Sequence, residues 1–392
     1  MNPTRRRLIC LSAMSGALSG LSTARAQSNP ANPALIANQG ISRDQILIGQ
    51  VISLEGGRNE HGVAVRQGVE AALREVELSG PIHGRKLVLR VMDDAAKAAE
   101  AEARARELAS QGVFMFFGSI EGGPSNAVMK VANETQRPFF GPMAGSPTLR
   151  RPHQPLVFPV RAEHREEFRV LLTQARNLGM RKVAFLQSDS DVGRLHLENL
   201  RAIANTLGMS VLLPMPFGSD VSDAMLLGFV RQMREKQVDV VLNHGSSGLY
   251  ERLIRSARSE GLTIPFFGIN SGSAQLARHL GPLAQGMVFT QVVPSPWERK
   301  TELTRNYQAA FKAAFRDQDF SYGSLEGYVT TLALAESLKK VGRDLSVASY
   351  LRAMADAQFD LAGYKMAWRT GDHAGSAFID TAIVTREGRF KH

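Results

Sequence analysis

The stretch between residues 46 and 94 constrains the fold most strongly, because it predicts two buried strands separated by one long helix. Residues 46–53 form an apolar run rich in β-branched side chains, long enough for a buried strand and too short for a core helix. From Val63 to Val76, apolar residues recur at steps of three and four, the spacing of an amphipathic helix. A second apolar strand over 86–92 completes a βαβ unit, whose crossover requires a parallel sheet covered on both faces.

The loop after the first strand is the first candidate site. Small ligands of parallel sheets bind beyond the carboxyl ends of the strands, so we expect Ser53 and Glu55 to line a pocket. Asp93 and Asp94 follow the second strand. We interpret these two carboxylates as a cap for the following helix, not as a catalytic pair.

The first 26 residues have the pattern of an export signal. Three arginines at 5–7 precede a mildly apolar segment over 8–21, and residues 24–26 form a small-x-small cleavage site. The segment is too short and too rich in Ser and Gly to span the ~30 Å of a bilayer core. Residues 4–9 fit both the twin-arginine route and ordinary Sec export. We predict a cleaved signal peptide over 1–26, a flexible leader over 27–40 and a periplasmic location.

Charge and cysteine content exclude several classes of protein. Without the four arginines of the signal, 43 Lys and Arg face 37 Asp and Glu, a net charge of +6, and the basic residues are scattered. A nucleic-acid surface therefore has little support. The single cysteine, Cys10, lies in the signal, so the mature chain has neither a disulfide nor a thiol nucleophile.

Beyond the opening unit, predicted strands and helices alternate over two blocks of similar size, up to about residue 291. Three consecutive helices then follow over 297–355, and short strands end the chain. This pattern predicts an α/β fold with two doubly wound, parallel-sheet lobes. We expect the late helices to return to the first lobe and the last strands to join the second.

Eight short stretches together indicate a family, although each by itself could occur by chance. They lie at 48–57, 84–94, 118–127, 141–149, 238–241, 257–262, 286–287 and 325–328. In this order the chain resembles the type I periplasmic binding proteins, specifically the leucine/isoleucine/valine-binding protein family of ABC importers. The resemblance implies two lobes joined by three crossings, near Arg161, Val293 and Phe359. The first lobe would comprise 41–160 plus 294–357, and the second 161–293 plus 358–392. Ligand would bind between lobes that close by a hinge motion, and an ABC permease in the inner membrane would receive it.

The same resemblance implies that the first lobe holds a ligand carboxylate with hydroxyls and backbone amides at two strand-to-helix loops. Those positions fall on Gly122 and on Met143, Ala144 and Gly145. Glycine replaces both family hydroxyls, at 122 and 145, which leaves backbone donors with help from Ser119 or Ser146.

In the second lobe, the residues at the family's ligand-binding positions differ more strongly from those of the family. Val192 and Ser246 stand where the family has aromatic residues, and Asn270 stands where it has the acid that binds the α-ammonium of an amino acid. His244 lies in the same pocket loop as Ser246. Burying an ammonium without its carboxylate is unfavourable, so we expect a small polar ligand without one. Glu55 or Glu121 could still supply a carboxylate from the first lobe.

Two functions remain open from sequence: solute capture for an ABC importer, and a periplasmic sensor of the same fold that feeds a signalling receptor. The motifs of hydrolases, metalloproteases and phosphate-binding loops are missing from the sequence, and the nine histidines show no metal spacing. We therefore predict a non-enzymatic protein without a cofactor or metal, acting as a monomer on a small-molecule ligand.

Overall fold

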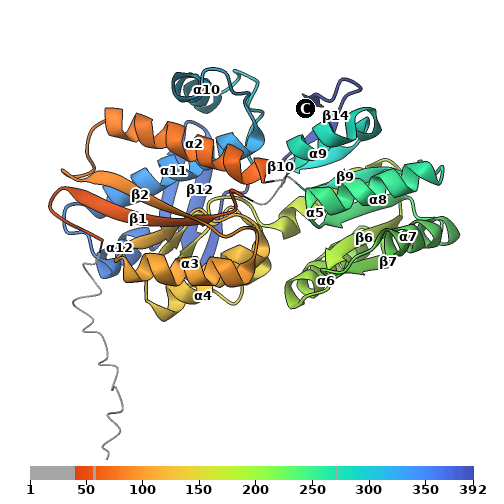
Figure 1. Ribbon diagram of the computed structural model, residues 1–392, viewed down its shortest axis with the longest axis horizontal. Helices are drawn as coiled ribbons and strands as arrows, with labels where there is room; N and C mark the ends of the chain where they lie inside the picture. The colour runs from red at the N-terminus through yellow and green to blue at the C-terminus, as the bar shows by residue number, and fades with distance from the viewer. Residues whose placement is uncertain (1–39, 56–58, 270–271) are drawn as a thin grey trace, which may run out of the picture.

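The computed structural model describes residues 40–55, 59–269 and 272–392. Two α/β lobes lie side by side, joined by several segments of chain (Figure 1). The predicted fold class, two doubly wound lobes, is confirmed. The sheet of the second lobe is mixed, because its two last strands run antiparallel to their neighbours.

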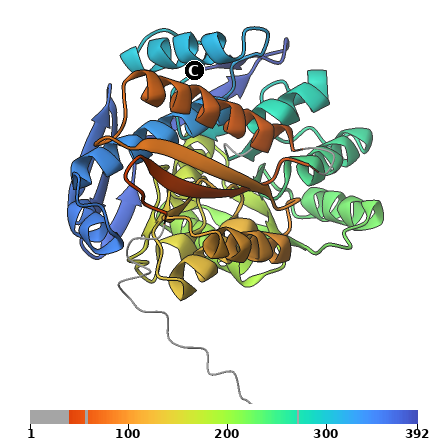
Figure 2. The ribbon, with the colours of Figure 1, turned by 60° about the vertical axis from the view of Figure 1, so that its left-hand side comes forward.

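The first lobe is built on a five-stranded parallel sheet with the order β2-β1-β3-β4-β5. Figure 2 shows β1 and β2 between α2 on one face of the sheet and α3 on the other. Both faces are therefore covered, as the apolar strands require. Its elements are β1 (Gln45–Ile52), α2 (Glu60–Leu78), β2 (Lys86–Asp93), α3 (Ala98–Ser110), β3 (Met115–Phe117), α4 (Gly122–Glu134), β4 (Phe139–Phe140), the short helix η1 (Pro147–Leu149) and β5 (Val157–Phe158).

The second lobe is built on a seven-stranded sheet with the order β15-β14-β10-β9-β8-β6-β7. Serine hydroxyls cap the starts of α6, α7 and α8, each accepting a backbone N–H three residues later. Its elements are α5 (His164–Asn177), β6 (Lys182–Ser188), α6 (Asp191–Thr206), β7 (Ser210–Phe217), α7 (Asp223–Glu235), β8 (Val240–His244), α8 (Ser247–Ser259), β9 (Phe266–Gly268), α9 (Ser273–Leu280), η2 (Gly281–Ala284), β10 (Val288–Gln291), β14 (Asp380–Val384) and β15 (Phe390–Lys391).

Three helices from late in the chain complete the first lobe: α10 (Glu302–Ala314), α11 (Tyr322–Val341) and α12 (Val347–Met354). Their apolar side chains share one core with β1 and α2. Helix α11 is buried along almost all of its length, which suits a helix packed between α2 and the rest of the lobe.

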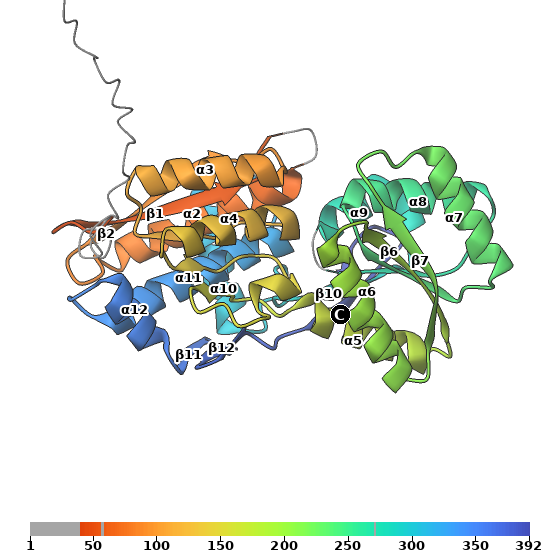
Figure 3. The ribbon, with the colours of Figure 1, turned by 90° about the horizontal axis from the view of Figure 1, so that it is seen from below.

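The third crossing differs from the one expected near Phe359. That residue lies in a separate three-stranded sheet of β11 (Ala357–Leu361), β12 (Tyr364–Arg369) and β13 (Asp372–Gly375). Figure 3 shows this sheet beneath the first lobe, beside α11 and α12. Trp368 anchors it, because its ring packs 5.7 Å from that of Phe140 and its Nε1–H donates to the Pro159 carbonyl. The chain enters the second lobe only over residues 376–379, between β13 and β14.

The buried face of α2 also differs from the expected one. Val63 is exposed, whereas Gly62 and Gly68 are buried. The reason is the close approach of α11: a Cβ built on Gly68 would lie 1.8 Å from the Ser324 carbonyl oxygen, and one on Gly327 would lie 2.3 Å from that of Val65. Glycines thus set the distance between the two helices.

This packing predicts that Gly68→Ala lowers the free energy of unfolding by about 1–3 kcal/mol, because the added methyl group forces the two helices apart. Gly228→Ala in α7 is the matched control, since nothing lies within 4 Å of its Cβ position. It should raise stability by up to about 1 kcal/mol through helix propensity. Urea denaturation of both variants checks this, and equal effects would contradict the close approach of α2 and α11.

Candidate functional site

The two lobes are joined by three crossings: residues 159–163 after β5, 292–301 after β10, and 376–379 after β13. Several contacts also pass directly from lobe to lobe. Gly145 N–H of the first lobe donates to His164 Nε2 of the second, at 3.2 Å. Glu60, the first residue of α2, pairs with Arg278 of α9. The boundary between the lobes is therefore the candidate site.

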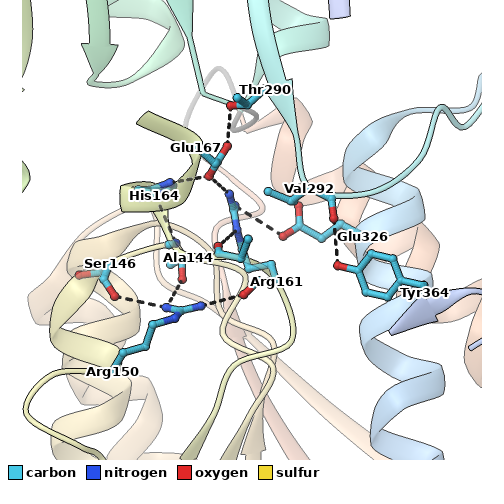
Figure 4. Close-up of polar contacts among 12 residues, drawn as sticks. Ala144, Ser146, Arg150, Arg161, His164, Glu167, Thr290, Val292, Glu326 and Tyr364 are labelled. Carbon is cyan, nitrogen blue, oxygen red and sulfur yellow. Dashed lines mark hydrogen bonds and ion pairs between the residues drawn. The ribbon is translucent and has the colours of Figure 1, made fainter. Parts of the chain in front are cut away.

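A buried polar cluster, the hinge cluster, is centred on Arg161 of the first crossing and also contains His164, Glu167, Thr290 and Glu326 (Figure 4). The Arg161 guanidinium pairs with Glu167 of α5, and its Nη1 lies 3.6 Å from Glu326 Oε1 of α11. Glu167 also accepts hydrogen bonds from Thr290 Oγ1 and His164 Nδ1, both at 2.8 Å. One cluster thus joins both lobes and the segment between them.

The electrostatics of the hinge cluster follow from these contacts. Burial by itself would raise the pKa of Glu167, but the charge of Arg161 and the hydrogen bonds from His164 and Thr290 lower it to about 2. The carboxylate is therefore ionised at neutral pH. Buried ions are costly to desolvate, so each depends on its partners to remain in place.

Two further contacts tie the crossings to the first lobe. Arg150 donates from Nη2 to the Arg161 carbonyl at 2.8 Å and from Nη1 to the Ala144 and Ser146 carbonyls at 3.4 and 3.3 Å. In the second crossing, the Val292 carbonyl accepts from the Tyr364 hydroxyl at 2.9 Å. The loop that holds Ala144 and Ser146 is thus fixed to the hinge cluster through Arg150.

The loop after β1 is held by the two carboxylates that follow β2. Ser53 is fully buried and its hydroxyl donates to Asp94 Oδ1 at 2.5 Å. Asp93 accepts from the amides of Leu54 and Glu55 at 2.8 and 3.1 Å, and Glu55 is exposed. The expected cap role is wrong: Lys97 is the N-cap residue of α3, and the aspartates fasten a loop instead.

The expected first-lobe amides are partly occupied by internal partners. Met143 N–H donates to the Ser119 carbonyl at 2.8 Å, and Gly145 N–H is taken by His164. The ring fills the space beside Gly145, because a Cβ there would lie 2.5 Å from His164 Nδ1. In this form His164 occupies one of the amides assigned to a ligand carboxylate.

The hydroxyls expected to help these amides are also engaged. Buried Ser119 shares a hydrogen bond with Ser125 at 2.8 Å, and buried Ser146 shares one with Thr148 at 2.8 Å. Gly122 is half-buried at the first residue of α4. The residue before it, Glu121, is exposed. Its backbone has φ 63° and ψ 152°, a conformation that residues other than glycine rarely adopt.

In the second lobe, the described site residues lie at the starts of helices or at the end of a strand. Val192 is half-buried in the first turn of α6. Ser246 is the exposed N-cap of α8 and accepts from the Leu249 amide at 3.3 Å. His244, the last residue of β8, is half-buried. Asn270 lies outside the described residues.

Sequence reasoning singled out only His244 from a group of rings at this boundary, which we call the histidine wall: His164, His196 and His244. The ring centroids of His196 and His244 are 3.7 Å apart, and those of His164 and His244 are 4.9 Å apart. His196 is fully buried on the inner face of α6. Their positions in the sequence could have indicated this group, because His164 begins α5 and His244 ends β8, and both of these element ends lie at the boundary.

Burial keeps the histidine wall uncharged. It lowers the pKa of His244 to about 3, with a further contribution from His164, and it lowers the pKa of His196 well below its usual value. On the first-lobe side, burial and the charge of Arg161 lower the pKa of His61 to about 4. Within the described residues, no group of three His, Cys, Asp or Glu side chains is placed to hold a metal.

A separate cavity of about 410 Å³ lies between α2 and β2, lined by residues that include Leu73, Ile82 and Leu87. Strand β2 is at the edge of the first-lobe sheet. None of the predicted site residues lines this cavity, so it is distinct from the boundary between the lobes.

The hinge cluster predicts that Glu167→Gln lowers the free energy of unfolding by about 3 kcal/mol, since it leaves the buried Arg161 with weaker compensation. Glu166→Gln is the control, because that exposed carboxylate pairs with Arg169 at the surface. It should cost at most about 1 kcal/mol. Guanidinium denaturation measures both, and a Glu167→Gln effect as small as the control's would show that the cluster adds little stability.

The buried histidines predict a pH dependence. Burial lowers the pKa of His61 to about 4 and the pKa of His244 to about 3, whereas an imidazole in the unfolded chain has a pKa near 6.5. Between these values the unfolded chain binds more protons, so stability falls as the pH falls. Between its pKa values in the folded and unfolded chain, each such histidine raises the unfolding constant about tenfold for every unit by which the pH falls.

We therefore expect the melting temperature to be level near pH 7 to 8 and to fall steadily towards pH 5. His244→Asn should reduce this slope, whereas His83→Asn, which changes an exposed histidine, should not. Melting curves in a series of buffers test the pair. An unchanged slope for His244→Asn would mean that this ring does not titrate as described.

Comparison with known proteins agrees with this architecture. The chain matches the family model described as periplasmic binding protein over residues 45–386. It is 25% identical over 362 residues to a Leu/Ile/Val-binding protein homolog 2 of Brucella abortus, covering 86% of this chain and 94% of that one.

Two solved structures are similar in fold. One is an extracellular ligand-binding receptor from Verminephrobacter eiseniae (TM-score 0.80, 25% identity, 89% of this chain and 100% of that chain). The other is an R. palustris solute-binding protein in complex with benzoate (TM-score 0.76, 17% identity, 88% and 95%). In the described residues, no helix is long and apolar enough to cross a membrane. The chain belongs to the periplasmic binding protein family, which confirms both the resemblance read from the sequence and the expectation of a solute-binding protein that is not an enzyme.

Proposed function

We propose that this protein captures a small polar metabolite between its two lobes in the periplasm and delivers it to an ABC permease of the inner membrane. The observation that carries the proposal is the hinge cluster. It concentrates the buried charge of the boundary at the crossings, where Arg161 touches residues of both lobes. A stiff pivot of this kind suits two lobes that rotate about the crossings.

The proposed ligand contacts are the loop ends at the boundary. On the first lobe they are the amides near Gly122 and Ala144, together with Glu55 or Glu121, whose side chains are exposed there. On the second lobe they are His244, Ser246, Val192 and, from sequence alone, Asn270. For transport, the ligand must prefer the closed form, because equal affinity for both forms shifts no population.

The proposed ligand lacks an α-ammonium. Asn270 offers no charge to such a group, and the described carboxylates of the hinge cluster already pair with Arg161, so an ammonium would depend on Glu55 or Glu121 of the first lobe. The Brucella relative is named for leucine, isoleucine and valine, and the R. palustris neighbour holds benzoate. Relatives and neighbours of this fold therefore differ in ligand, and the residues of this chain favour a ligand other than an amino acid.

A thermal-shift screen of the mature protein tests the proposal against amino acids, aliphatic and aromatic carboxylates, amides and polyamines. A true ligand at 100 times its Kd should stabilise the protein by about 2.7 kcal/mol. We expect a strong shift from a compound without an ammonium and a weak one from leucine, isoleucine and valine. A leucine shift as large as any other, unaffected by Asn270→Ala, would contradict the ligand assignment.

A second measurement addresses closure. Small-angle scattering should show a smaller radius of gyration on addition of the compound that shifts the melting temperature. Turnover of that compound would contradict capture, and binding without any change in the radius would contradict a closing motion.

A further inference from the structure

The second-lobe side of the boundary contains buried polar atoms with no partner among the described residues. They include Gln187 Oε1, His244 Nδ1 and both ring nitrogens of His196, and Asn243 Oδ1 and Gln291 Oε1 at the ends of β8 and β10 are also without a partner in the described part of the chain. Gln187 is 4% exposed and His196 is fully buried. Buried polar groups are nearly always hydrogen-bonded, so each of these atoms calls for an explanation.

Gln187, His196 and His244 lie next to one another on one face of the second-lobe sheet and form one small surface. Gln187 and His244 are paired residues of the neighbouring parallel strands β6 and β8, so their side chains stand on the same face of the sheet. The His196 ring lies behind His244 at 3.7 Å between centroids. Both strands end at this point, and His164 beside them accepts a hydrogen bond from Gly145 of the first lobe. The surface therefore meets the boundary between the lobes.

Its chemistry selects among ligand head groups. A neutral imidazole offers one N–H donor and one acceptor nitrogen, and Gln187 Oε1 is an acceptor. A carboxylate would place its charge against that unpartnered carbonyl oxygen. An ammonium would lie within the field of Arg161, whose charge reaches His244, while Glu167 is already engaged by Arg161, His164 and Thr290.

We propose that Gln187 and His244, with His196 behind them, form a recognition site for an uncharged amide group of the captured solute. An amide presents a C=O acceptor next to N–H donors. Its C=O would accept from the imidazole N–H, and its N–H groups would donate to Gln187 Oε1 or to the acceptor nitrogen of the imidazole. It is also planar, so it can lie along the ring of His244. This inference rests on the proposed capture function and specifies which class of solute the two lobes capture.

The test uses two series of compounds that differ only in head group: benzamide, benzoate and benzylamine, and isovaleramide, isovalerate and isopentylamine. Calorimetry and thermal shift are measured on the mature protein. We expect the amide of at least one series to bind at least tenfold more tightly than its carboxylate and its amine.

His244→Phe keeps a ring of similar shape and removes both nitrogens. It should weaken amide binding about tenfold or more. His153→Phe is the matched control, because His153 lies beside His373 in the first lobe, with ring centroids 4.6 Å apart, and should leave binding unchanged. Circular dichroism confirms that each variant is folded. The ¹⁵N shifts of the His244 ring should move to hydrogen-bonded values on addition of the amide, which a merely structural role would not produce.

Tighter binding of a charged member, unchanged amide affinity in His244→Phe, or no binding by either amide would overturn the inference. If amides fail while an amino acid or carboxylate of the wider screen binds, capture stands and only the amide site falls. If no compound of any class binds the wild-type protein, the capture function falls with it.

Discussion

The pair of Arg161 with Glu167 is the interaction on which the arrangement of the two lobes depends. Arg161 stands in the first crossing, Glu167 on the first helix of the second lobe, and Glu326 on a helix of the first. Three buried ionisable groups at one point are unfavourable unless their geometry is kept. Any motion of the lobes must therefore either preserve this cluster as a pivot or replace its partners.

The same cluster extends to the candidate ligand surfaces through short contacts. His164 donates to Glu167 with one nitrogen and accepts from Gly145 with the other. Arg150 joins the carbonyls of Ala144 and Ser146 to that of Arg161. The first-lobe loop expected to bind a ligand is thus not a free anion site. Met143 N–H is taken by the Ser119 carbonyl and Gly145 N–H by His164, so a ligand that used Gly145 N–H would have to displace His164.

Most of the fold could be predicted from sequence, because strand and helix periodicities are local. The errors have specific tertiary causes. Val63 fits the apolar face of α2 by spacing, but α11 approaches over Gly68 instead. Phe359 looks like the start of a second-lobe strand, but Trp368 and Phe140 pack together and hold β11–β13 on the first lobe. The site was harder still: Ser53 and Ser119 stand at strand ends, as ligand residues do, yet their hydroxyls bond to Asp94 and Ser125.

The sequence by itself determined the two alternating α/β blocks, the family and the loops that end each strand, because those features lie in periodicity and in short local motifs. Only the tertiary structure decided which side chains meet. His164, His196 and His244 are far apart in the chain and come together because α5, α6 and β8 converge at one edge of the second lobe. Partners of buried polar groups are chosen by such convergence, and no local pattern records it.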